Sequence, residues 1–170
     1  DFHDQEKLKD LLLALNKIKK QNKTNIPLLL KVSPDIKDNH ISEIADVAKK
    51  NDIAAIILTN TTNSNRDDLK SALKKEEGGL SGEPLQKIST DIIKKFYRQL
   101  NGSIPIIGVG GVNSGKSAYE KIIAGASLLQ LYTGFVYKGP SVAKNIKKEL
   151  IQILKNEGIK NLKEAIGKGV

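Results

Sequence analysis

Four short apolar runs, each followed by a stretch with helical spacing, constrain the fold of this 170-residue chain most strongly. The runs lie at 26–32, 53–58, 104–109 and 127–131, and nearly every residue in them is apolar. Strands of this kind are typical of a parallel sheet that is buried on both faces. The alternation predicts an α/β fold, in which a first helix at 6–20 precedes four β–α units.

The helical segments repeat apolar residues every three or four positions. After the first helix, further helices are expected around 41–48, 85–100, 114–124 and 142–153, and a short one after Asn161. Asn161 and Glu164 have the spacing of a capping box. Residues 63–84 form a polar excursion between the second strand and the next helix. Because ligands of parallel sheets bind at the carboxyl ends of the strands, the site is expected there.

The residues at these strand ends suit an anionic ligand with a polar ring. They are Lys31, Thr59-Asn60-Thr61, Gly110-Gly111 and Tyr132-Thr133. A buried ammonium is costly unless it faces an anion, so Lys31 is expected to meet one; the alternative is a lysine that reaches water. The amide of Asn60 can donate and accept, as recognition of a pyrimidine-like ring requires, although it could also serve only the turn.

A second motif suggests a different function. Residues 110–117 fit the pattern G-x-x-x-x-G-K-S after a strand and before a helix, which is the context of a nucleotide triphosphatase loop. No aspartate ends a neighbouring strand to hold magnesium, and Asp35 lies beyond a Ser-Pro turn. The amides of Gly110-Gly111 and of the following helix could still hold a phosphate. A non-catalytic, phosphate-binding half barrel is a third alternative.

Composition excludes several classes of function. The chain has no cysteine and two histidines, so no metal site, disulfide scaffold or thiol nucleophile is expected. The net charge is +9, but every basic residue except Arg66 and Arg98 is lysine and aromatic residues are few, so no nucleic-acid partner is expected. No apolar run approaches the roughly 18 residues of a membrane span. Methionine is absent even from position 1, which favours a processed protein or a fragment.

Five segments stand in the order and at the spacing of a known family. They are 30–35, 58–62, 78–85, 104–112 and 124–133. From about residue 2 to residue 167, the chain closely resembles class 2, quinone-dependent dihydroorotate dehydrogenase. The Gly-Gly-Leu-Ser-Gly segment at 78–82 and the closing segment 161–167 favour class 2 over class 1. The resemblance implies an FMN-binding (β/α)8 barrel, of which residues 1–170 would be one domain, the C-terminal half with the last four β–α units.

The resemblance also implies roles for the strand-end residues. Lys31 would lie beside the flavin and stabilise the anionic reduced ring. Thr59 would contact the flavin, and Asn60 and Thr61 would hydrogen-bond the ring of dihydroorotate or orotate. The other FMN contacts would come from Gly82, Gly111, Tyr132 and Thr133, the last three around the phosphate.

The implied reaction is the oxidation of dihydroorotate to orotate in de novo pyrimidine biosynthesis, with hydride transfer to FMN and then to quinone. The family's serine base lies in the missing first half, so no catalytic residue is expected here. Ser33, Ser81 and Ser114 do not replace it, because no nearby histidine could activate them. The missing half of the barrel would be a partner. The missing N-terminal part would attach the enzyme peripherally to the membrane surface, at the bacterial or the mitochondrial inner membrane.

Overall fold

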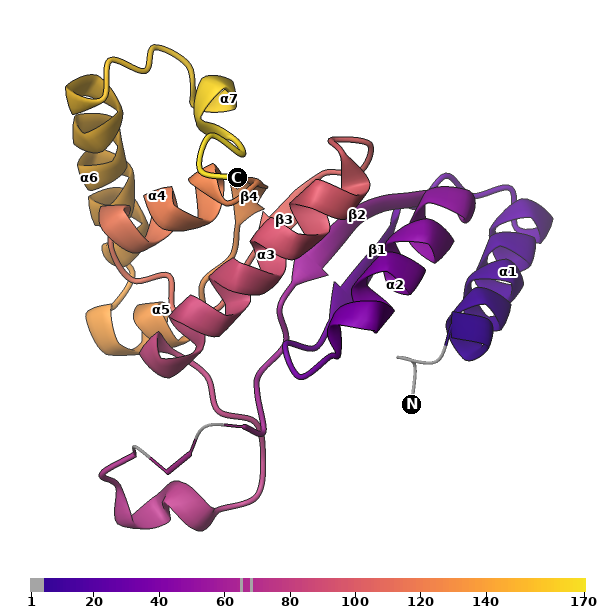
Figure 1. The fold of residues 1–170 in the computed structure, drawn as a ribbon, viewed down its shortest axis with the longest axis horizontal. Coiled ribbons are helices and arrows are strands. Elements are labelled where there is room, and N and C mark those ends of the chain that lie inside the picture. Colours follow the sequence, from indigo (N-terminus) through magenta and orange to yellow (C-terminus); the bar gives the residue numbers. More distant parts are fainter. Residues whose placement is uncertain (1–4, 65, 68) are drawn as a thin grey trace.

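A four-stranded parallel sheet forms the centre of the computed structural model, which describes residues 5–64, 66–67 and 69–170 (Figure 1). The strands follow the order β1-β2-β3-β4, as they do along the chain. They are β1 (Leu28–Val32), β2 (Ile53–Leu58), β3 (Ile106–Gly108) and β4 (Ala126–Leu129). Each strand overlaps a predicted apolar run, so the predicted α/β fold with four parallel β–α units is confirmed.

The helices agree with the predicted segments to within a few residues. They are α1 (Gln5–Gln21), α2 (Asp38–Lys50), α3 (Gln86–Leu100), α4 (Gly115–Ile123), α6 (Val142–Asn156) and α7 (Leu162–Ala165). Asn161 caps α7, since its side chain accepts from the amide of Lys163. Three short elements were not predicted: α5 (Thr133–Lys138) and the 3-10 turns η1 (Ala72–Lys75) and η2 (Glu83–Leu85). Segments this short cannot show a helical period.

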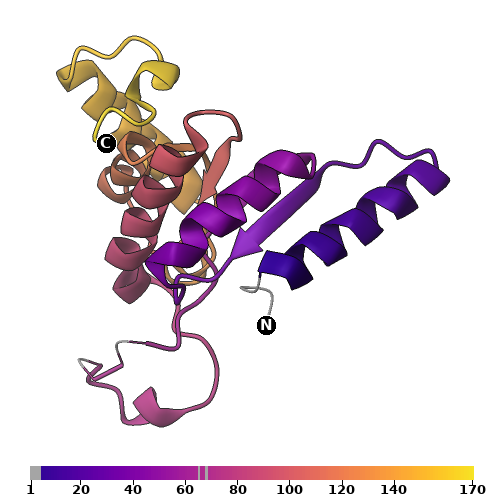
Figure 2. The same ribbon diagram turned by 45° about the vertical axis from the view of Figure 1, so that its right-hand side comes forward.

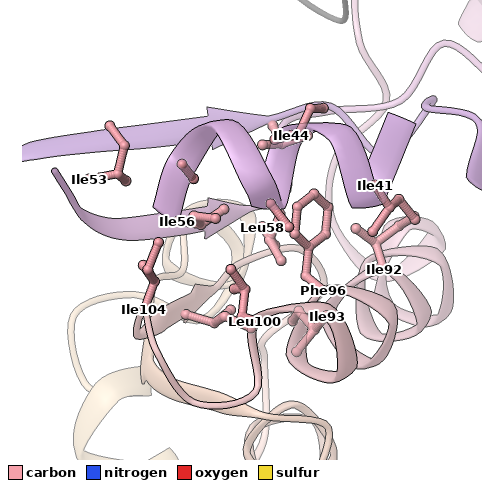
Figure 3. Packing of buried hydrophobic residues seen from close by; sticks show 14 of the residues in the cluster. Ile41, Ile44, Ile53, Ile56, Leu58, Ile92, Ile93, Phe96, Leu100 and Ile104 are labelled. Atoms are coloured by element: carbon pink, nitrogen blue, oxygen red, sulfur yellow. The ribbon is translucent and has the colours of Figure 1, made fainter. Parts of the chain in front are cut away.

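The main core lies between one face of the sheet and helices α2 and α3 (Figure 3). Ile56 and Leu58 of β2 meet Ile44 of α2 and Phe96 of α3, and all four are almost fully buried. Helix α1 packs on α2 at one end of the molecule, and α6 packs on α4 at the other (Figures 1 and 2). No helix in the described parts of the chain is long and apolar enough to cross a membrane.

The opposite face of the sheet is open in the described chain. Leu29 of β1 is 44% exposed and Leu128 of β4 is 62% exposed, and Lys31 of β1 is exposed as well. The expectation that both faces would be buried is therefore wrong for β1 and β4. The strands are apolar as predicted, but the helices that pack on them cover a single face.

A clamp at the carboxyl edge holds the start of the long segment between β2 and α3. The carboxylate of Asp35, which follows β1, accepts from Thr62 Oγ1 at 2.5 Å and from the amide of Asn63 at 2.7 Å. Thr62 also pairs with Leu80 in an antiparallel bridge. The described residues between Thr62 and Leu80 project away from the body of the molecule (Figures 1 and 2). The clamp brings residues 59–62 and 79–82 together beside the sheet.

Candidate functional site

An open cavity of about 1010 Å3 lies at the carboxyl ends of the four strands. Its walls come from every strand end and from the segment that precedes α3. All the site residues predicted from the sequence line it, namely Lys31, Thr59, Asn60, Thr61, Gly82, Gly111, Tyr132 and Thr133. These residues are up to 102 positions apart in the sequence, and the parallel sheet brings them to one edge.

Lys31 projects from the open face of β1 into this cavity. It is the only charged residue in the four strands. Its side chain is exposed, so the premise that its ammonium is buried is wrong, for the same reason that Leu29 is exposed. Among the described residues, its ammonium has neither an ion pair nor a hydrogen bond. The charge is therefore available to an anion in the cavity.

The turn after β2 is tied to the strands on both sides of it. The amide of Thr59 donates to Val109 O at 3.2 Å, and the amide of Asn60 donates to Val32 O at 2.8 Å. Thr59 is only 2% exposed, and its hydroxyl donates to Asn60 O. The side-chain amide of Asn60 has no partner within the described chain, whereas its backbone serves the turn. The carboxamide is thus free to recognise a ligand.

The segment 79–82 crosses the cavity from the β2 side to the β4 side. A Cβ at Gly79 would lie 1.9 Å from Thr61 Oγ1, and one at Gly82 would lie 3.0 Å from Thr133 Cγ2. The hydroxyls of Ser81 and Thr133 are 2.9 Å apart. These contacts fix the wall that joins the two ends of the sheet.

The turn after β3 requires glycine for two separate reasons. Gly110 and Gly111 have φ angles of +110° and +72°, which side chains rarely adopt. A Cβ at Gly111 would lie 2.5 Å from Gln86 Cβ and 2.8 Å from Gln86 Cα. The turn thus packs directly on the start of α3 while its other side lines the cavity.

The triphosphatase alternative is wrong, because the N-terminus of α4 is closed. The amide of Gly115 donates to Glu149 Oε2 at 2.5 Å, so a carboxylate from α6 takes the place of a phosphate. Ser114 and Ser117 form a reciprocal cap, and Lys116 is exposed and does not line the cavity. The expectation that this helix could help to hold a phosphate fails for the same reason. The expectation that the backbone amides of Gly110 and Gly111 could hold a phosphate is not affected.

Among the residues that line the cavity, Gln130, Tyr137 and Lys138 were not predicted from the sequence. Gln130 follows β4 directly, but it lies inside the predicted apolar run 127–131, so the strand-end rule did not select it. Tyr137 and Lys138 belong to α5, which shows no helical period; Lys138 Nζ donates to Asn113 O at 2.9 Å. Among the described residues, no histidine lines the cavity, and no cluster of three metal-ligating side chains is present.

Comparison with known proteins decides the family. A family model described as dihydroorotate dehydrogenase matches residues 1–154. The chain belongs to the dihydroorotate dehydrogenase family. It is 47% identical over 152 residues to the dihydroorotate dehydrogenase (quinone) of Christiangramia forsetii, covering 89% of this chain and 44% of that relative. With the mitochondrial dihydroorotate dehydrogenase (quinone) of Mus musculus it shares 48% identity over 140 residues, 82% of this chain and 35% of the mouse protein.

A solved structure supports the same family assignment. The dihydroorotate dehydrogenase of Eimeria tenella in complex with ferulenol superimposes with a TM-score of 0.89 at 36% identity, over 98% of this chain and 49% of the Eimeria chain. The resemblance inferred from five sequence segments is therefore confirmed. The chain spans less than half the length of each of these relatives.

Proposed function

We propose that this chain forms the cofactor and substrate site of a quinone-dependent dihydroorotate dehydrogenase, as the C-terminal half of its (β/α)8 barrel. Such an enzyme oxidises dihydroorotate to orotate in de novo pyrimidine biosynthesis. One observation carries the proposal: the residues that the family resemblance selects, drawn from all four strand ends, line a single cavity.

The cavity fits FMN in size and in chemistry. Its volume of about 1010 Å3 matches the upper end of ligand pockets, about 300–1,000 Å3. Gly111, Tyr132 and Thr133 would hold the phosphate with backbone amides and hydroxyls. Gly82 would bring backbone close to the cofactor without a side chain, and Thr59 would contact its ring.

The remaining residues would act on charge and orientation. FMN, when bound, would accept a hydride from dihydroorotate and pass the electrons to quinone. Lys31 would hold its positive charge where negative charge develops, an electrostatic stabilisation that needs no rearrangement because β1 fixes the side chain's origin. Asn60 and Thr61 would orient the substrate, since an amide and a hydroxyl can satisfy both the carbonyls and the N–H groups of its ring.

The described cavity contains no histidine that could activate a serine. We infer that the base that removes the substrate proton comes from the other half of the barrel. Quinone and the membrane surface would be further partners of the complete enzyme. We propose peripheral attachment to a bacterial or a mitochondrial inner membrane, because the relatives include a bacterial and a mitochondrial dihydroorotate dehydrogenase (quinone).

A hybrid enzyme tests the proposal. In it, the aligned part of this chain, 89% of its length, replaces the matching segment of the Christiangramia forsetii relative. The hybrid is expected to bind FMN and to oxidise dihydroorotate with a quinone as acceptor. Asn60→Ala should lower kcat/KM by at least about tenfold, the loss of one or two hydrogen bonds, and retain FMN. Lys116→Ala is the matched control and should change neither. A hybrid that holds FMN but does not oxidise dihydroorotate would contradict the proposal.

A further inference from the structure

Among the described residues, Lys121 of α4 is the only charged side chain that is fully buried. Its ammonium donates to Ser89 Oγ, to Thr90 Oγ1 at 3.1 Å and to Gln86 O at 3.4 Å. Three acceptors satisfy the three hydrogens of an ammonium. No described carboxylate forms an ion pair with it. The charge is hydrogen-bonded, but no carboxylate of the described chain is in direct contact with it.

This lysine cluster lies directly behind the Gly110-Gly111 turn. Ser89 Oγ accepts from Lys121, and its own proton lies within reach of two backbone carbonyls, Gln86 O at 3.2 Å and Gly110 O at 3.3 Å. A Cβ at Gly110 would lie 2.9 Å from the same Ser89 Oγ. One side of the turn therefore rests on residues that Lys121 holds, and the other side lines the cavity.

Burial lowers the pKa of Lys121 to about 8, and the nearby carboxylates of Glu120 and Asp91 oppose this shift. Glu120 itself accepts from Gln86 Nε2 at 2.6 Å. On α6, which also packs on α4, the carboxylate of Glu149 is engaged by the amide of Gly115. At neutral pH the ammonium keeps its charge, and charges act more strongly in a protein interior than in water.

We propose that Lys121 is a positioning residue for the phosphate end of the cofactor site: its ammonium fixes the Gly110-Gly111 turn through Ser89 and supplies the positive charge behind it. This inference rests on the proposed function. An anion bound at the turn would add a negative charge on the side of Lys121 that the carboxylates of Glu120 and Asp91 do not contact directly. Lys121 does not line the cavity, so it acts through the turn and not by contact with the ligand.

The test compares two flavins and two substitutions in the full chain. FMN carries a phosphate and riboflavin does not, and binding of each is measured by flavin fluorescence. Lys121→Met keeps the length of the side chain and removes the charge. It should weaken FMN binding on the order of tenfold, the effect of one charge at an effective dielectric near 20, and leave riboflavin binding unchanged. Lys116→Met, an exposed position on the same helix, is the matched control and should alter neither.

The pH dependence of FMN affinity distinguishes the effect of the Lys121 charge from the effect of its packing. Between pH 7 and pH 9 the unchanged chain should lose FMN affinity as Lys121 gives up its proton, since the phosphate stays doubly charged there. Lys121→Met should abolish this dependence. Ser89→Ala breaks the link to Gly110 but keeps the charge, so it should retain the pH dependence.

The rate of amide hydrogen exchange at residues 110–113 shows how firmly the turn is held, and it can be measured without any flavin. Exchange should become faster in Lys121→Met and Ser89→Ala and stay unchanged in Lys116→Met. Equal exchange in all variants would overturn the positioning role. If Lys121→Met lowers the affinities for FMN and riboflavin equally, the role of the charge is overturned. It is also overturned if the unchanged chain binds FMN no more tightly than it binds riboflavin. If the unchanged chain and the hybrid bind no flavin, the proposed function fails, while the exchange measurement still decides whether Lys121 holds the turn.

Discussion

Replacing Gly111 with alanine should damage the chain far more than the same change at Gly102. The two glycines have nearly the same positive φ angle, +72° and +73°. They differ in what a Cβ would meet. At Gly102 nothing lies within 4 Å, whereas at Gly111 the Cβ would lie 2.5 Å from Gln86 Cβ and 2.8 Å from Gln86 Cα. The pair therefore separates the cost of the conformation from the cost of the contact.

The left-handed conformation costs an alanine about 1–2 kcal/mol, and reduced freedom of the unfolded chain returns about 0.4–1 kcal/mol. Gly102→Ala should thus lower the free energy of unfolding by about 1 kcal/mol. At Gly111 the neighbouring atoms include backbone of α3, which cannot rotate away. Overpacking adds about 1–3 kcal/mol, so Gly111→Ala should cost about 2–4 kcal/mol in total.

Urea denaturation of the chain at one fixed concentration measures both variants. Gly111→Ala should also weaken FMN binding, because the turn must shift, while Gly102→Ala should leave it unchanged because that residue lies outside the cavity. Equal destabilisation by the two substitutions would refute the contact between Gly111 and Gln86.

Two other predictions concern the chain itself. Below pH 8 the buried ammonium of Lys121 costs up to about 3 kcal/mol, the equivalent of lowering its pKa from 10.5 to about 8. Between pH 8 and 10.5 the unfolded state binds more protons than the folded state, so the free energy of unfolding of the unchanged chain should rise with pH relative to that of Lys121→Met. Urea titrations at several pH values measure both free energies, and a difference between them that does not change with pH would refute this. In the part of the chain that the structure describes, β1 and β4 each have one free edge and expose Leu29 and Leu128. The chain alone should therefore self-associate through these strands, and a monodisperse monomer in light scattering would contradict this.

The sequence was sufficient to predict the sheet and the strand-end residues that line the cavity. Strands with nearly continuous apolar residues identify a parallel sheet, and the chemistry at their carboxyl ends identified Lys31 and Asn60. The exposure of Lys31 could not be predicted, because it depends on which faces the helices cover. An apolar run contains no information about that.

Two other features depend on contacts between distant residues. The G-x-x-x-x-G-K-S match is local, but Glu149, 34 positions after Gly115, closes the helix that the motif begins. Lys121 belongs to an ordinary amphipathic pattern and resembles a solvated lysine. Only the packing of α4 on α3 buries it against Ser89 and Thr90.

The most direct test of the central claim is anaerobic mixing of dihydroorotate with the FMN-loaded hybrid, followed by the loss of flavin absorbance. The hybrid should be bleached rapidly. Lys31→Ala should slow the bleaching on the order of 10² while FMN stays bound, because the phosphate is held elsewhere, and Lys116→Ala should have little effect. Normal bleaching in Lys31→Ala, or a flavin that dihydroorotate does not bleach in the unchanged hybrid, would contradict the assignment of this cavity.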